Sequence, residues 1–356
     1  MKRRDFVKKM GLTTLLGSSL ISTTARSSAE YKWKMVTTWP KNFPGLGTGA
    51  EHLASLINLM SGGRINVIVY GSGELVPAFE IFDAVSNGVA EMGHGSAYYW
   101  KGKNEALQFF STVPFGMTAN EMNAWLYRGG GLELWEEAYS PFNLIPMAAG
   151  NTGVQMGGWF NKEIKSINDL KGLKMRIPGL GGEVLKRAGG TPVNLPGGEL
   201  FTALKTGVID ATEWVNPYND LAFGLHKAAK YYYYPGWHEP GTTLECFLNK
   251  DRFQELPNDL KEIVKGAAKI ANMDMLCEYI SRNNDALKIL KNKHKVKIKP
   301  FPDDVLNMLR DISLEVVEEI SHTNEISRKI YNSYVEFHEK TAAWNNISLK
   351  PYMKAK

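Results

Sequence analysis

The sequence predicts an α/β protein of two lobes with a ligand cleft between them. The chain has 356 residues, which is more than a single hydrophobic core usually fills. Its composition, with 44% hydrophobic and 22% charged residues, is that of an ordinary globular protein. Segments typical of strands and helices alternate along it in two successive series, a pattern that favours mostly parallel sheets with helical connections.

The first series covers residues 31–97. We expect strands at residues 31–39, 64–71 and 88–97, with helices at residues 49–60 and 77–87 between them. The second series begins after residue 150. Its expected strands are residues 154–161, 173–179, 191–196 and 208–214, and its expected helices are residues 182–188 and 197–207. The uncharged stretch 138–161 is too rich in proline and glycine for a membrane helix and predicts buried strands and turns.

The two series share one segment. Residues 82–94 (FDAVSNGVAEMGH) align without gaps with residues 201–213 (FTALKTGVIDATE), and each reads as a helix whose terminal glycine leads into a strand. The alignment predicts two similar lobes and places His94 and Glu213 just past equivalent strands. Because open α/β sheets bind ligands at the carboxyl ends of their strands, we expect both side chains to face the cleft.

The remainder of the chain reads as helical. A helix from Pro257 to about Lys293 would be about 50 Å long at 1.5 Å per residue, enough to span both lobes. We assign residues 30–150 plus 241–280 to one lobe and 151–240 plus 281–325 to the other, leaving 326–356 as a C-terminal helical extension. That extension carries a stripe that would pack on its own chain or on a second subunit: Ile326, Ile330, Tyr334, Phe337, Thr341 and Trp344.

Residues 1–29 read as a twin-arginine export signal, which places the mature protein in the periplasm. Arg3 and Arg4 are followed by an uncharged stretch that is too short for a permanent anchor, and by small residues up to Ala29. This leader carries the whole net charge of +5, so the rest of the chain offers no basic excess for nucleic acid. Because this route exports folded proteins from a reducing cytosol, we expect Cys246 and Cys277 to be unpaired core residues.

No catalytic signature is recognisable. The chain lacks GxSxG, HExxH and Walker patterns, and its glycine-rich stretches at Gly45 and Gly179 do not complete GxGxxG. We therefore expect a binding protein and not an enzyme; a periplasmic enzyme on a two-lobe scaffold remains the alternative.

The residues that remain suggest a site for a carboxylate and a cation. Arg176 ends a predicted strand, where its guanidinium could hold a carboxylate through two parallel hydrogen bonds. Gln155 and Glu213 are oxygen donors in otherwise uncharged segments, a combination that suits a hard cation. The alternatives are a solvated Arg176, and a Glu213 that only pairs with Arg176. The surrounding candidates are aromatic walls at Trp214 and Tyr218, a donor at Asn216, and His94, which could equally be an interior histidine.

Two long motifs carry a family resemblance. Residues 169–179 (DLKGLKMRIPG) and 185–214 (LKRAGGTPVNLPGGELFTALKTGVIDATEW) resemble the periplasmic solute-binding proteins of tripartite ATP-independent periplasmic (TRAP) transporters, the DctP-like group. The resemblance covers essentially the whole mature chain. Gln155, Arg176 and the pair Glu213-Trp214 are similar to the branch that binds 2-oxo acids such as pyruvate, or lactate, as a cation complex.

The resemblance implies a two-lobe periplasmic binding protein fold in which Arg176 holds the substrate carboxylate. It implies a Na⁺ or Ca²⁺ that bridges substrate and protein, bound by Gln155, Glu213 and the carbonyl of Trp214; one acidic ligand slightly favours Na⁺. Further pocket contacts carried over from the family are Asn151, Tyr99, Trp100 and Asn216. The implied partners are TRAP membrane subunits, and a second copy of the chain bound through the C-terminal helix. A binding protein of an ATP-driven importer or a sensor would share the fold.

Overall fold

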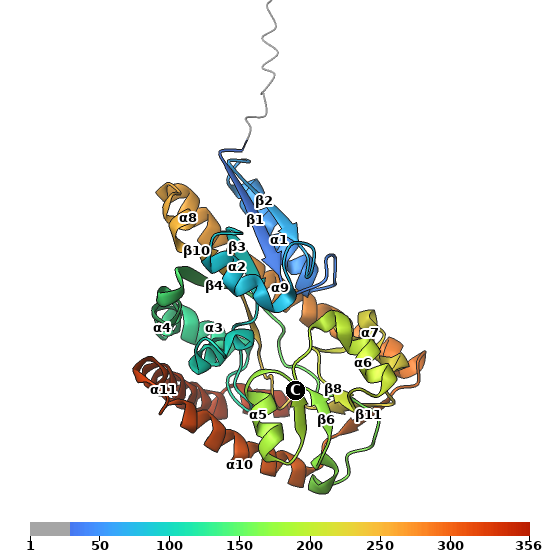
Figure 1. Cartoon of the computed structure of the whole chain (residues 1–356). Helices are drawn as coiled ribbons and strands as arrows, with labels where there is room; N and C mark the ends of the chain where they lie inside the picture. Colours follow the sequence, from blue (N-terminus) through green and yellow to red (C-terminus); the bar gives the residue numbers. More distant parts are fainter. Residues whose placement is uncertain (1–28) are drawn as a thin grey trace, which may run out of the picture.

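The computed structural model describes residues 29–356. The predicted twin-arginine leader therefore lies outside the described residues, apart from its last position. Figure 1 shows two lobes, one built around β1, β2 and β3 and one around β6, β8 and β11. The predicted two-lobe α/β fold, with a long helix and a C-terminal helical extension, is confirmed. Among the described residues, no helix has the length and apolar character that crossing a membrane requires.

The first lobe is built on a five-stranded sheet in the order β2-β1-β3-β10-β4. Its strands are β1 (Tyr31–Thr37), β2 (Ile65–Tyr70), β3 (Met92–Gly95), β4 (Leu144–Asn151) and β10 (Thr243–Asn249). The first three are parallel, but β10 runs antiparallel to both β3 and β4. The expected parallel series is thus correct for β1 to β3, and β10 enters the sheet from far along the chain.

The second lobe holds a six-stranded sheet in the order β11-β9-β5-β8-β6-β7. Its strands are β5 (Gly158–Phe160), β6 (Lys174–Arg176), β7 (Thr191–Val193), β8 (Ala211–Thr212), β9 (Tyr231–Tyr234) and β11 (Lys297–Pro300). The strand expected at residues 208–214 is shorter than predicted. Val208 is 62% exposed, and only Ala211 and Thr212 pair as β8. The strand is short because β5 and β6, its neighbours, are themselves three residues long.

Three segments connect the lobes. Residues 152–157 lead from β4 to β5, and residues 235–242 lead back from β9 to β10. These two crossovers are tied together by backbone hydrogen bonds: Gly236 N–H donates to the Gln155 carbonyl at 2.9 Å, and Gln155 N–H donates to the Glu239 carbonyl at 3.1 Å. The third is α9 (Asn258–Asn292), the predicted long helix, which packs on α1 (Leu46–Met60) and β4 in the first lobe and on α7 (Pro217–Phe223) in the second.

The other helices cover the outer faces of both lobes (Figure 1). They are α2 (Ile81–Ser86), α3 (Ala119–Arg128), α4 (Gly131–Tyr139), α5 (Gly179–Arg187), α6 (Leu200–Thr206), α8 (Lys250–Gln254), α10 (Asp303–Ile320), α11 (Glu325–Ile347) and α12 (Leu349–Ala355). The buried hydrophobic side chains form three clusters: one lies within the first lobe, a second contains residues of both lobes, and so does a third. That third cluster contains Trp39 of the first lobe, Trp214 of the second and Tyr279 of α9.

The C-terminal stripe divides into two parts. Ile330 and Tyr334 are buried against the first lobe, and the Tyr334 hydroxyl accepts a hydrogen bond from the Met117 N–H at 2.9 Å. Trp344, later in the same helix, is 65% exposed. One further expectation is wrong: Cys277 is exposed and not a core residue, because its position on α9 faces solvent, whereas Cys246 is buried as expected.

Candidate binding site between the lobes

Arg176 is the last residue of β6 and is completely enclosed. The strand ends because Pro178 follows two residues later, and α5 begins at Gly179. The Arg176 side chain is 1% exposed, which rules out a solvated edge arginine. Its Nε donates to the Leu195 carbonyl at 3.1 Å, and its guanidinium carbon lies 5.2 Å from the centre of the Trp214 ring.

Glu213 follows β8 and forms a buried ion pair with Arg176. One carboxylate oxygen, Oε1, accepts a hydrogen bond from Arg176 Nη1. Burial acts to lower the pKa of Arg176, but the charge of Glu213 together with those of Tyr99, Tyr98 and Glu239 outweighs it. The pKa of the guanidinium is therefore raised and it stays charged. The second oxygen, Oε2, has no hydrogen-bond partner among the described residues. Glu213 is therefore the partner of Arg176 and also keeps one oxygen free for a cation.

Gln155 lies on the crossover between β4 and β5. Its amide nitrogen donates to Glu239 Oε2 at 2.7 Å and to Thr152 Oγ1 at 3.1 Å. Its amide oxygen is buried and accepts no hydrogen bond within residues 29–356. A buried acceptor without a donor is costly in the isolated protein, and a cation would satisfy it.

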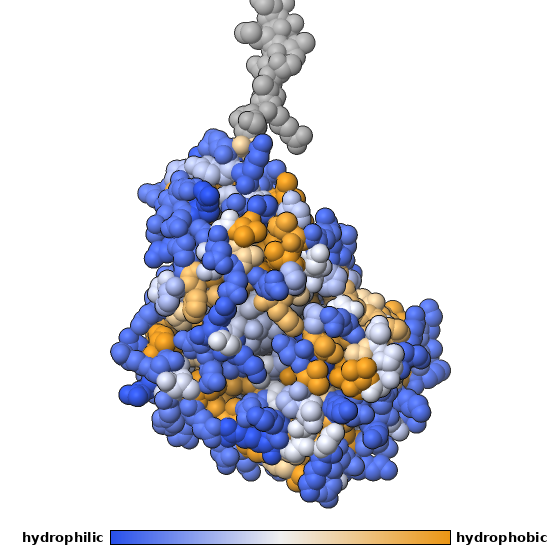
Figure 2. Space-filling model, viewed as in Figure 1, coloured by the Kyte–Doolittle hydropathy of each residue, from blue (hydrophilic) through white to orange (hydrophobic). Residues whose placement is uncertain are grey.

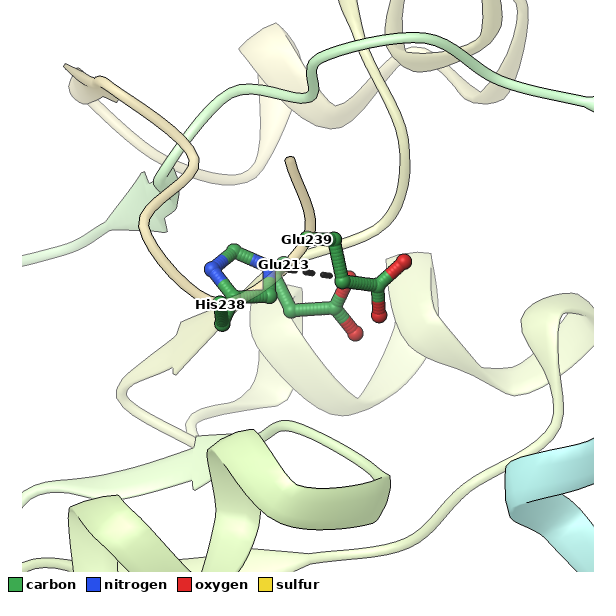
Figure 3. A group of neighbouring side chains, drawn as sticks. All are labelled: Glu213, His238 and Glu239. Carbon is green, nitrogen blue, oxygen red and sulfur yellow. Dashed lines mark ion pairs between the residues drawn. The ribbon is translucent and has the colours of Figure 1, made fainter. Parts of the chain in front are cut away.

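Two residues that the sequence analysis missed complete this group. His238 and Glu239 lie on the other crossover and face Glu213, as Figure 3 shows. The ligand atoms of Glu213, His238 and Glu239 all lie within 4.8 Å of one another, and His238 Nε2 is 3.5 Å from Glu213 Oε2. A signal was available: Glu239 is the sole acidic residue between Asp220 and Glu245. The criterion that singled out Glu213, an acid in an uncharged segment, applies to it equally.

The protonation of Glu239 depends on its neighbours. Burial and the charge of Glu213 raise the pKa of Glu239 to about 8, so that it holds a proton at neutral pH when no cation is bound. The charges of Arg176 and Glu213 then cancel, and the enclosed cluster carries no net charge. A divalent cation placed against these carboxyl oxygens would displace that proton.

The available atoms fit a hard cation. Gln155 Oε1 and Glu213 Oε2 lack partners, and no hydrogen bond among the described residues ends on the Trp214 carbonyl oxygen. With the Glu239 carboxyl these atoms make an oxygen-rich set, as Na⁺ and Ca²⁺ require. His238 is the less suitable neighbour, because imidazole nitrogen favours softer metals.

A small cavity adjoins the cluster. Its volume is about 10 Å³, enough for a single water-sized sphere. Its walls come from both lobes: Trp39, Leu46, Tyr98, Tyr99, Thr152, Gln155, Trp214, Val215, Thr242 and Leu244. The Tyr99 hydroxyl lies 3.3 Å from Arg176 Nη2, which links the lobes directly. The lobes are therefore closed over the site.

The structure brings together only part of the predicted contact set. Tyr99, Gln155 and Trp214 line the cavity, and Arg176 and Glu213 adjoin it. Asn216, the N-cap of α7, donates to the Thr152 carbonyl at 3.2 Å, and its amide oxygen has no partner among the described residues. Asn216 thus ties the second lobe to the first crossover beside Gln155.

Four other predicted contacts lie away from the cavity wall. His94 is inside β3, where its Nδ1 accepts a hydrogen bond from Trp39 Nε1 at 2.8 Å, and burial lowers its pKa to about 4. Trp100 donates to Glu245 in the first-lobe core. The amide of Asn151 is used by neighbouring backbone and by Thr243. Tyr218 donates to Glu278 and lines a separate surface hollow of about 380 Å³.

Comparison with known families and structures identifies the chain. The family model described as "Bacterial extracellular solute-binding protein, family 7" (DctP) matches residues 35–324. The chain belongs to this family. Within it, the chain is 42% identical to a protein of Nostoc sp. named "Monocarboxylate 2-oxoacid-binding periplasmic protein", over 99% of this chain and 98% of that one. The predicted family resemblance is confirmed.

Two solved DctP-family structures are close in sequence and fold. A TRAP periplasmic solute-binding protein from Pseudoalteromonas atlantica, with bound sodium and pyruvate, is 43% identical with a TM-score of 0.89, and the match covers 92% of this chain and 99% of that chain. A TRAP transporter solute-binding protein from Bordetella bronchiseptica, a dimer with calcium and picolinate at its active site, is 37% identical with a TM-score of 0.89, covering 92% and 98%. Both relatives hold a small carboxylate together with a cation.

Proposed function

We propose that this protein is the extracytoplasmic receptor of a TRAP transporter and that it captures a small monocarboxylate, a 2-oxo acid such as pyruvate or else lactate, with a bound cation. The observation that carries the proposal is the enclosed Arg176 beside three oxygen atoms that lack hydrogen-bond donors in residues 29–356: Gln155 Oε1, Glu213 Oε2 and the Trp214 carbonyl. The relatives that bind pyruvate with sodium, or picolinate with calcium, support it.

Each group has a distinct part in this capture. Arg176 would hold the substrate carboxylate, for which its planar guanidinium is well suited. Gln155, Glu213, Glu239 and the Trp214 carbonyl would hold the cation, which supplies positive charge to the carboxylate and to the oxygen on the adjacent carbon. Tyr99 and Trp39 close the pocket from the first lobe.

The charges of the site bear on the choice of cation. Arg176 contributes one positive charge, whereas Glu213, an ionised Glu239 and the substrate contribute three negative charges. A divalent cation makes the sum zero, and a monovalent cation does so if Glu239 keeps its proton. The slight preference for Na⁺ in the sequence analysis assumed a single acidic ligand. Because Glu239 supplies a second carboxyl, that preference no longer holds.

The positions of these residues couple binding to lobe closure. Gln155 and Glu239 lie on the two crossovers, Arg176 and Glu213 in the second lobe, and Tyr99 in the first. A complex that contacts all three regions has higher affinity for the closed form than for an open one. TRAP membrane subunits would then recognise the closed form. We also propose that the leader directs export through the twin-arginine route and that the receptor performs no catalysis.

The exposed end of the C-terminal extension supports a dimer. Trp344, Ile347, Tyr352 and Met353 are 61–75% exposed, an unusual concentration for a monomer surface. We expect a second copy of the chain to cover them. Deleting residues 342–356 keeps Tyr334 in the core and should give a monomer in light scattering, whereas an unchanged mass would remove this part of the proposal.

The deciding experiment is calorimetric titration of the metal-stripped mature protein. Pyruvate, 2-oxobutyrate, 2-oxoisovalerate and lactate are each titrated in Na⁺, in Ca²⁺ and in a choline background. We expect tight binding of at least one acid with either metal cation and weak or no binding in choline. Absence of binding in all three backgrounds would contradict the proposal, and cation-independent binding would contradict the metal site.

A further inference from the structure

Asp220 is a buried carboxylate directly behind the proposed cation site. It lies on α7 and is 1% exposed. Its Oδ2 accepts hydrogen bonds from Trp159 Nε1 at 2.9 Å and from the Tyr232 hydroxyl at 2.6 Å, and its Oδ1 accepts one from the Val215 N–H at 3.3 Å. Within residues 29–356, no basic side chain forms an ion pair with it. Three neutral donors therefore satisfy this carboxylate.

The bond to Val215 bears on the site because of peptide geometry. The Val215 N–H belongs to the same peptide group as the Trp214 carbonyl, and in a trans peptide these two groups point in opposite directions. With the N–H held toward Asp220, the Trp214 carbonyl is turned away from α7. No hydrogen bond among the described residues ends on that carbonyl oxygen.

The next peptide group is also held. The Val215 carbonyl accepts a hydrogen bond from the Met156 N–H at 3.1 Å, and Met156 follows Gln155. The backbone around Val215 is thus clamped between α7 and the first crossover. Among the described residues, the bond to Asp220 is the hydrogen bond that holds the peptide group of the Trp214 carbonyl.

The two oxygens of Asp220 have separable roles. Oδ2 joins β5 to β9 through Trp159 and Tyr232, whose rings stack with centres 4.1 Å apart. Oδ1 contacts the peptide group next to the site. A change at Oδ2 alone would disturb the strands, whereas a change at Oδ1 would disturb the carbonyl.

We propose that Asp220 is a positioning residue of the cation site, which orients the Trp214 carbonyl through its hydrogen bond to the Val215 N–H. This inference rests on the proposed function. An acceptor on the N–H side of a peptide also polarises the group and increases the negative charge on its oxygen. Partners that orient metal ligands in this way commonly change metal affinity by about 10- to 100-fold when removed.

The test compares Asp220→Asn with Tyr232→Phe. The asparagine removes the charge and leaves too few acceptors for three donors, whereas the phenylalanine removes one donor to Oδ2 and keeps the Val215 bond. With pyruvate held in excess, calcium is titrated calorimetrically into wild type and both variants, and thermal unfolding is recorded for each. We expect an increase in the calcium Kd of about 10- to 100-fold in Asp220→Asn and less than about twofold in Tyr232→Phe, although both lower the unfolding temperature.

Equal calcium affinity in the two variants would overturn the inference. If wild type itself shows no cation-dependent pyruvate binding, the proposed function fails instead, so the two failures are distinguishable.

A measurement on the unmodified protein covers the case in which Asp220→Asn does not fold. A cation on the Trp214 carbonyl should strengthen the Val215 N–H bond to Asp220, so the Val215 amide proton should move downfield in NMR when calcium and pyruvate are added. The Asp210 amide, which donates to the Lys174 carbonyl at 2.7 Å in the same lobe, is the control and should not move. An unchanged or upfield Val215 resonance would overturn the inference.

Discussion

Two buried carboxyl clusters of this protein differ in whether all of their oxygens accept hydrogen bonds. In the first-lobe core, Glu245 is completely buried, and its oxygens accept hydrogen bonds from Trp100 Nε1 at 2.5 Å and from the Tyr139 hydroxyl at 2.6 Å. Between the lobes, Glu213 is equally buried, but one of its oxygens and the nearby Gln155 oxygen have no donor among the described residues.

Glu245 has a structural role, whereas the cluster around Glu213 is suited to binding. Burial raises the pKa of Glu245 to about 7, and burial with the Glu213 charge raises the pKa of Glu239 to about 8. A perturbed pKa therefore does not distinguish the two clusters. The oxygens without donors do, because a buried acceptor that no donor satisfies is costly and a bound cation would remove that cost.

The largest expected effect comes from removing both charges of the ion pair between the lobes. Replacing Arg176 and Glu213 together by Gln keeps the enclosed charge at zero, so the fold should persist and the pyruvate Kd should rise by at least about 100-fold. Alanine at either position alone would leave an unpaired buried charge and cost about 3–5 kcal/mol of stability. Calorimetry with circular dichroism checks both quantities. Pyruvate affinity within tenfold of wild type in the double variant would assign the carboxylate to another residue.

Glu239→Gln tests the acid that the sequence analysis missed. The amide keeps the size of the side chain and removes its charge, so we expect the calcium Kd at saturating pyruvate to rise about 10- to 100-fold. Sodium affinity should change less, since charge balance with Na⁺ is reached with Glu239 protonated. Titration of both cations measures the ratio. Parallel losses for Na⁺ and Ca²⁺ would contradict this charge assignment.

The buried carboxyl groups should also determine how the stability of the protein depends on pH. The folded-state pKa of Glu239 lies above its unfolded value, as do those of Glu245 and Asp220, both about 7. The unfolded chain therefore binds fewer protons, and the stability of cation-free protein falls as pH rises from about 4.5 through about 8. His94 and His226, whose pKa values burial lowers to about 4, oppose this trend. Comparing pH 6.5 with pH 8 leaves out most of their contribution, which falls between about pH 4 and pH 6.5.

Thermal unfolding of metal-stripped protein measures this slope. Glu239→Gln should make it shallower, and added calcium should do the same in wild type, because calcium binds the ionised carboxyl. An unfolding temperature that rises between pH 6.5 and pH 8 would contradict the shifted values.

The smallest expected effect is that of Glu245→Gln on binding. Glutamine can accept from Trp100 and donate to Tyr139, so the variant should change stability by about 1–2 kcal/mol and leave the pyruvate and calcium Kd values within about twofold. The measurement is the same pair of titrations. A tenfold loss would show that the first-lobe cluster takes part in binding and that satisfied oxygens do not mark a purely structural acid.

Local patterns in the sequence were sufficient to predict several elements of the fold. The α9 helix was predicted within two residues of its bounds, because after Pro257 the segment contains no further proline and a single glycine, Gly266. The antiparallel insertion of β10 between β3 and β4 was not predicted, since periodicity says how a segment folds and not which strand it pairs with. The hydrogen bond of His94 was not predicted for the same reason: its partner, Trp39, is 55 residues away.

The sequence by itself determined that the chain has two α/β lobes and a long helix, and that it belongs to the DctP family. It also singled out Arg176 at the end of a strand and Glu213 in an otherwise uncharged segment. Only the tertiary structure decided that Glu239 joins them from the second crossover and that particular oxygens are left without donors. The physical reason is that hydrogen-bond satisfaction is a sum over neighbours from distant segments. The residue type reveals what an atom can bind, and the packed fold decides what it does bind.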